Sequence, residues 1–112
     1  MGSHHKGSKR QSLRFSVLDH PIRYKTEFED GEALIENVST GGCAMSSLEV
    51  QLSHKEKILL LLDLEEDTIE IGARVIRVEE SRVAVQFTDI TEENSLKLVK
   101  YFARKQRAAK LV

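Results

Sequence analysis

Two arginines near the start of the chain, Arg10 and Arg14, are separated by only three residues. An arginine side chain presents a planar fork of N–H donors, which pairs with a phosphate or with the O6/N7 edge of guanine and also stacks flat on a base. At this spacing, both forks can face the same way in a helical turn or along a bent arm. Taken alone, the pair is more typical of a solvated arm, so its chemistry depends on what lies beside it.

A second polar cluster follows in the segment Asn-Val-Ser-Thr-Gly-Gly at residues 37–42. The amide of Asn37 and the hydroxyl of Ser39 can hydrogen-bond a base, and Gly42 would let a ligand approach the backbone closely. The same residue types also suit a tight turn that caps its own backbone. This segment alone therefore leaves a turn and a binding site open.

The two clusters, separated by 22 residues, together resemble the bipartite signature of PilZ domains, which are bacterial receptors for cyclic di-GMP. The likeness extends from about Lys9 to Lys105. Residues 72–77 are similar to the family's strand before its last hairpin, and residues 83–87 are similar to its closing strand. Ala84 departs from the family pattern, in which glycine is common at this position.

The resemblance implies a six-stranded antiparallel PilZ-like barrel with a helix packed outside it, and cyclic di-GMP as the ligand with no further cofactor. It implies that the arginines hold phosphates and guanine edges, and that the second cluster contacts a guanine. The residues implied are Arg10, Arg14, Asn37, Ser39 and Gly42, with weaker indications for Lys9 and Arg77. Lys9 would add a phosphate contact if it is not simply solvated. Arg77 sits where some family members stack a residue on the ligand, and an ion pair with Glu79 or Glu80 is the alternative.

The pattern of apolar residues independently predicts an all-β fold. Strand signals recur every 8–12 residues, which is typical of a barrel or sandwich with antiparallel pairing. Residues 57–64 read as a strand with apolar residues on both faces, so both faces must be covered. Val83, Val85 and Phe87 alternate with polar or small residues, as in a half-buried strand. Asp30-Gly31 is a typical hairpin turn signal between two extended runs.

The chain is expected to end in a helix over about residues 91–108. Thr91 is a suitable N-cap, acidic residues follow it, and basic residues occupy the last turns, which is the order that the helix dipole favours. Leu96, Val99 and Ala103 share one stripe. We expect this helix to cover the outer face of residues 57–64.

Length and composition indicate one small domain. The 112 residues are 40% hydrophobic and 31% charged, and no apolar run approaches the roughly 20 residues that cross a bilayer. Residues 1–8 read as a flexible and partly tag-like tail, and residues 9–112 as a single domain. The polar, basic start shows no secretory signal, and the single cysteine, Cys43, suits a reducing cytoplasm.

Charge is divided along the chain. Residues 1–14 carry four basic and no acidic residues, residues 15–93 carry all 18 acids and seven bases, and residues 94–112 carry six bases and no acid. A basic arm before an acidic body favours a compact anion over a long polyphosphate. The chain also has few aromatic residues on which bases could stack, so nucleic-acid binding is not expected.

These observations predict a cytoplasmic cyclic di-GMP receptor or adaptor. Its N-terminal arm would change conformation over the ligand, and the change would signal to a downstream protein. An enzyme is not expected, because His20 and His54 accompany no nucleophile motif, and neither a metal site nor membrane insertion is expected. Two alternatives stay open: a PilZ-like protein-interaction module without ligand, and a small barrel that binds nucleic acid.

Overall fold

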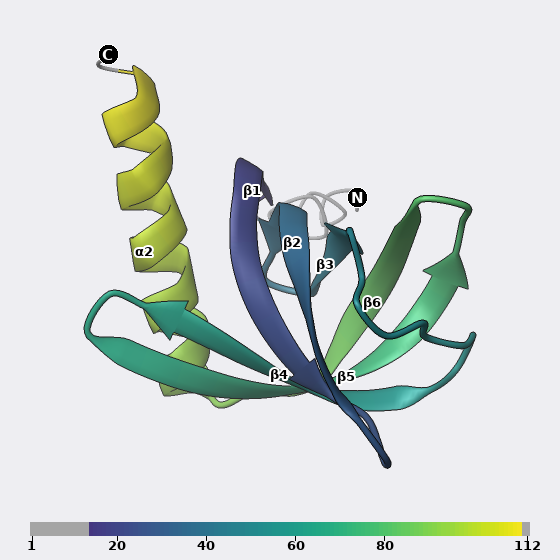
Figure 1. The fold of residues 1–112 in the computed structure, drawn as a ribbon. Helices are drawn as coiled ribbons and strands as arrows, with labels where there is room; N and C mark the ends of the chain where they lie inside the picture. Colours follow the sequence, from purple (N-terminus) through teal and green to yellow (C-terminus); the bar gives the residue numbers. More distant parts are fainter. Residues whose placement is uncertain (1–13, 111–112) are drawn as a thin grey trace, which may run out of the picture.

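The computed structural model describes residues 14–110 of the chain, which form six strands followed by one helix (Figure 1). The elements are β1 (Arg14–Lys25), β2 (Asp30–Ser39), β3 (Gly42–Ser46), β4 (Lys57–Leu64), β5 (Asp67–Val78), β6 (Arg82–Asp89) and α2 (Glu92–Lys110). Within these residues, no helix is both long enough and apolar enough to cross a membrane.

The strands close into a barrel in the order β1-β2-β3-β6-β5-β4, and every neighbouring pair is antiparallel. The expected six-stranded antiparallel barrel with a C-terminal helix is therefore confirmed. Residues 1–8 and Lys9 lie outside the described residues, so the division into a tail and a single domain stays a prediction.

The barrel interior is filled by alternate residues of the strands. In β4, Ile58, Leu60, Leu62 and Leu64 are buried, as their two-residue period requires. Cys43 is buried in the same core, and burial raises the pKa of its thiol to about 12. At neutral pH the thiol is therefore protonated, and Cys43 acts as a small core residue.

Among the register irregularities of the barrel, two β-bulges beside the β3–β6 pair interrupt this alternation. Between β2 and β3, Ile35 pairs with Met45 and Asn37 pairs with Ala44, which leaves Glu36 as an extra residue in β2. A bulge of this kind re-aims the side chains that follow it. Ile35 and Val38 are both fully buried although they are three residues apart, and Asn37 between them is only half-buried.

The second bulge lies in β5, where Val75 pairs with Val85 and Arg77 pairs with Ala84. Ile76 is the extra residue there, and it is 46% exposed. The two bulges flank the central β3–β6 pair, one on each side of it.

The helix does not cover the outer face of β4 as expected, and it packs mainly against β1. Its buried residues are Leu98, Tyr101 and Phe102, whereas Leu96 is 52% exposed. The Phe102 ring stacks on Phe15 with the ring centroids 6.4 Å apart. The helical period of 3.6 residues allows more than one apolar stripe along this sequence. The stripe that contains Tyr101 and Phe102 is the one that is buried.

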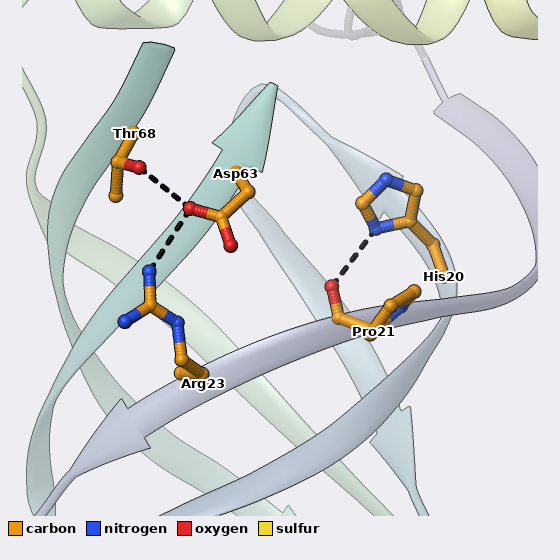
Figure 2. Close-up of polar contacts among 5 residues, drawn as sticks. All are labelled: His20, Pro21, Arg23, Asp63 and Thr68. Carbon is orange, nitrogen blue, oxygen red and sulfur yellow. Dashed lines mark hydrogen bonds and ion pairs between the residues drawn. The ribbon is translucent and has the colours of Figure 1, made fainter. Parts of the chain in front are cut away.

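The space for the helix arises because β1 and β4 pair only over Arg23–Lys25 and Leu59–Leu61. Beyond that stretch the two strands diverge, and α2 stands beside the first half of β1 (Figure 1). Figure 2 shows the polar contacts at this divergence, where the Arg23 guanidinium donates to Asp63 over 2.9 Å and Thr68 donates to the same carboxylate oxygen over 2.5 Å. These contacts, led by the Thr68 hydroxyl, lower the pKa of Asp63.

The expected turn at Asp30-Gly31 is also wrong, because both residues already belong to β2 and pair with Lys25 and Tyr24. The turn spans residues 26–29 instead, closed by the Thr26 amide, which donates to the Glu29 carbonyl oxygen over 2.7 Å. A Cβ atom at Gly31 would lie 2.8 Å from the Tyr24 ring. The glycine therefore makes room for an aromatic side chain and does not form the turn.

Candidate functional site

Most of the predicted residues line one shallow depression of about 420 Å³ on the outer face of the barrel. Its volume lies in the range of small-molecule sites. It crosses five strands, from the start of β1 to the end of β5. The residues that line it and enter the argument below are Arg14, Asn37, Ser39, Gly42, Ile76, Arg77, Arg82, Ala84 and Gln86.

Five of the seven predicted site residues meet at this depression. Arg14 comes from β1, Asn37 and Ser39 come from β2, Gly42 begins β3, and Arg77 lies in β5. The other two, Lys9 and Arg10, lie outside the described residues. Arg10 precedes the first described residue, Arg14, by four positions, so the chain enters the barrel at the edge of the depression.

The strand register explains why residues so distant in sequence converge. Arg14 pairs with Ser39 across β1 and β2. Asn37 pairs with Ala44, Ala44 with Ala84, and Ala84 with Arg77, so one cross-strand row joins Asn37 to Arg77. The two residues in the middle of this row are alanines, whose small side chains form the floor of the depression between the longer polar side chains at its ends.

Ser39 is already engaged in the β2–β3 turn. Its hydroxyl donates to the Gly42 carbonyl oxygen over 3.3 Å and accepts from the Gly41 amide over 3.2 Å. A hydroxyl has one proton and two acceptor lone pairs, so one lone pair remains for a ligand. Ser39 thus has the turn role that the sequence left open, and toward any ligand its hydroxyl could only accept a hydrogen bond.

Gly42 is required by the barrel itself. A Cβ atom at this position would collide with the backbone carbonyl oxygen of Val85 in β6. By contrast, a Cβ atom at Gly41 meets nothing within 4 Å. The close approach of β3 and β6 therefore demands the second glycine of the pair, whatever binds outside.

Two arginines of the depression are paired with carboxylates at its rim. The Nε atom of Arg77 lies 3.1 Å from a carboxylate oxygen of Glu79, which is one of the two partners considered from the sequence. The Nε atom of Arg82 lies 3.3 Å from a carboxylate oxygen of Glu36, the bulged residue of β2. The site therefore presents three guanidinium groups, two of which are partly neutralised.

The lining residues that sequence reasoning did not find include three with large exposed side chains, Ile76, Arg82 and Gln86. For two of them the signal was present: Arg82, Ala84 and Gln86 alternate with the buried Val83 and Val85, so period-two alternation places all three on the outer face. Ile76 had no such signal, because its exposure follows from the bulge.

His20 belongs to β1 and does not line the depression, and its ring packs against Tyr101 and Phe102 of α2. Its Nδ1 donates to the Pro21 carbonyl oxygen over 2.9 Å (Figure 2), and its Nε2 accepts from the Tyr101 hydroxyl over 3.0 Å. Burial lowers the pKa of His20, and Lys105 adds to that effect. The described residues contain no group of three or more His, Cys, Asp or Glu side chains placed to hold a metal ion.

Comparison with protein families finds a match to the PilZ domain over residues 8–104. A comparison with curated proteins finds no match. Solved structures match well in fold. The PilZ domain of YcgR from Escherichia coli with c-di-GMP superposes with a TM-score of 0.76 at 13% identity, covering 91% of this chain and 97% of that one.

Two further structures agree. The PilZ domain of CeSA from a cellulose-synthesizing bacterium gives a TM-score of 0.65 at 18% identity, covering 80% of this chain and 94% of that one. The MrkH–c-di-GMP complex from K. pneumonia gives 0.70 at 22% identity, covering 90% of this chain and 53% of that one. This chain therefore spans about half the length of MrkH. At these identities the superpositions establish the shared fold.

Proposed function

Because the chain belongs to the PilZ domain family, we propose that its barrel is a receptor domain for cyclic di-GMP. The observation that carries the proposal is the convergence of Arg14, Asn37, Ser39, Gly42 and Arg77 on one depression. Structures of similar fold from Escherichia coli and K. pneumonia contain this nucleotide, which supports the choice of ligand.

The chemistry of the depression suits this ligand, which carries two negative charges and two guanine rings. Arg14 supplies a fork of donors for a phosphate or for the O6/N7 edge of guanine. Ser39 has only an acceptor to offer, and guanine presents N–H donors on its Watson–Crick edge. The amide of Asn37 provides both a donor and an acceptor beside it.

We further propose that Lys9 and Arg10 complete the site from the segment that precedes Arg14. In this proposal, binding changes the conformation of that segment, and the altered surface is recognised by a downstream protein in the cytoplasm. A ligand signals only if the bound and free states differ in what they present to a partner. The domain then acts as an adaptor and not as an enzyme.

The nucleic-acid alternative finds no support in the surface. Of the six aromatic residues in the sequence, only Phe28 is exposed, at the turn between β1 and β2 and away from the depression. Single-stranded nucleic acids usually bind to several aromatic platforms in a row.

The test is isothermal titration calorimetry of the whole chain with cyclic di-GMP, with cyclic di-AMP as the matched control. We expect saturable binding of cyclic di-GMP, and a melting temperature that rises with its concentration by mass action. Absence of both heat and a melting shift at millimolar cyclic di-GMP would overturn the proposal and favour the ligand-free interaction module.

A further inference from the structure

The depression has a third arginine, Arg82, to which the family signature gives no role. It lies at the start of β6, two residues from Ala84, with its side chain on the outer face. Its Nε atom lies 3.3 Å from a carboxylate oxygen of Glu36. Both side chains remain accessible, at 47% and 36% exposure, so the pair lies in solvent and can open.

Glu36 reaches Arg82 from the bulge of β2. The extra residue there lies immediately before Asn37, which lines the depression. The Glu36 side chain lines the neighbouring hollow of about 550 Å³, and Arg82 lines both that hollow and the depression. Arg82 therefore lies between the Glu36 carboxylate, which already accepts from it, and the depression in which an anionic ligand would lie.

Resting on the proposed function, we infer that Arg82 is a further ligand-binding arginine and that Glu36 is a built-in competitor for it. A carboxylate and a phosphate accept the same donors of a guanidinium fork. A dianionic ligand in the depression thus exchanges one anionic partner of Arg82 for another. Glu36 lowers the affinity in two ways, because it holds Arg82 back and because its own charge repels the ligand.

This arrangement gives the two partners opposite effects on cyclic di-GMP affinity, measured by calorimetry on the full chain. Arg82→Gln should weaken binding by about 10-fold, since a charge-assisted hydrogen bond is lost. Glu36→Gln should tighten binding by about two- to fivefold, which is the range that an exposed ion pair allows. The gain should shrink as salt concentration rises, because exposed charges are screened.

The matched control is Asp63→Asn. Asp63 pairs with Arg23 at 2.9 Å, its side chain is 63% exposed, and it does not line the depression. The substitution removes one negative charge from a comparable surface ion pair elsewhere on the barrel. A gain in affinity for Glu36→Gln equal to that for Asp63→Asn would reduce the effect to net charge and overturn the inference.

A double-mutant cycle isolates the contact itself. With Arg82→Gln already present, Glu36→Gln should tighten binding less than it does alone, because there is no longer a guanidinium for which Glu36 and the ligand compete. If the effects of the two substitutions on the binding free energy simply add, Glu36 acts only by repelling the ligand and does not compete for Arg82. Weaker binding by Glu36→Gln alone would mean that the carboxylate orients Arg82, and unchanged binding by Arg82→Gln would remove Arg82 from the site.

These outcomes are separable from the proposed function. If the unmodified chain does not bind cyclic di-GMP, the proposed function fails first. If it binds and neither the Arg82 nor the Glu36 variant differs from the Asp63 control, both parts of this inference are refuted and the proposed function stands. Circular dichroism and melting curves of each variant show that the barrel is intact.

Discussion

Arg14 lies directly opposite Ser39 in the β1–β2 pair, so the last residue of the arginine motif is aligned with the serine of the Asn-x-Ser motif. The antiparallel register brings together two residues that are 25 positions apart in the sequence. The alignment also places Arg14 at the rim of the depression that Asn37 and Gly42 line.

The first prediction concerns Arg14. Replacing it by alanine should weaken cyclic di-GMP binding roughly 10- to 1000-fold, because one or two charge-assisted hydrogen bonds disappear. Arg10→Ala should have an effect of the same order. The control is Arg23→Ala, on the same strand as Arg14 but outside the depression. Calorimetry that gives one affinity for all three variants would contradict the site.

The second prediction separates the two neighbouring glycines. Gly42→Ala should lower the free energy of unfolding by about 1–3 kcal/mol or more, because its Cβ atom collides with the Val85 carbonyl oxygen. Gly41→Ala should change it by no more than about 0.5 kcal/mol, since that Cβ atom meets open space. Urea denaturation measures both. Equal stability of the two variants would show that β3 can move away from β6 at no cost.

Because of this collision, loss of binding in a Gly42 variant does not by itself identify a ligand contact. At the observed β3–β6 spacing, a bulky side chain at this position would disturb the fold as well as any ligand contact. Arg14 is the cleaner probe, because its exposed side chain can be removed without a change in the core.

The third prediction concerns Tyr24, whose side chain is fully buried and hydrogen-bonded twice to Val50. The hydroxyl donates to the Val50 carbonyl oxygen over 2.5 Å and accepts from the Val50 amide over 2.8 Å. Tyr24→Phe leaves both backbone groups without this partner and should cost about 1–3 kcal/mol of unfolding free energy. Denaturation curves that coincide with those of the unmodified chain would show that water replaces the hydroxyl.

The fourth prediction is a pH dependence from His20. Burial against α2 lowers the pKa of His20 from 6.5 in the folded chain, helped by Lys105 and opposed by the Pro21 carbonyl and Asp63. The unfolded chain therefore takes up the proton more readily, and the free energy of unfolding should decrease as pH falls below about 6.5. Protonation also ends the hydrogen bond that Nε2 accepts from Tyr101.

Denaturation at pH 7.5 and pH 5.5 measures this effect. The decrease between the two pH values should be smaller in His20→Gln, which cannot titrate. The exposed His54 gives the matched control, since His54→Gln also removes one histidine side chain but none that packs against α2. An equal decrease in the unmodified chain and in His20→Gln would assign the pH dependence to other groups.

The local pattern of the sequence predicted much of the fold. Alternating apolar residues predicted β4 at its observed bounds and the inward face of β6. Thr91 caps α2 as expected, because its hydroxyl accepts from the Asn94 amide over 3.0 Å. These features depend on residues close in sequence, and their geometry follows from the strand period, the helix period and capping chemistry.

Pairing between distant strands decided the remainder. Whether Glu36 and Ile76 are bulged depends on the register of β2 against β3 and of β5 against β6, which no local pattern specifies. The same pairing required a glycine at Gly42, and the divergence of β4 from β1 placed α2 on β1. The residue types that form the depression could therefore be read from the chain. The inclusion of Arg82 and its pairing with Glu36 follow only from the closed barrel, because a side chain's neighbours across strands are set by register and not by sequence order.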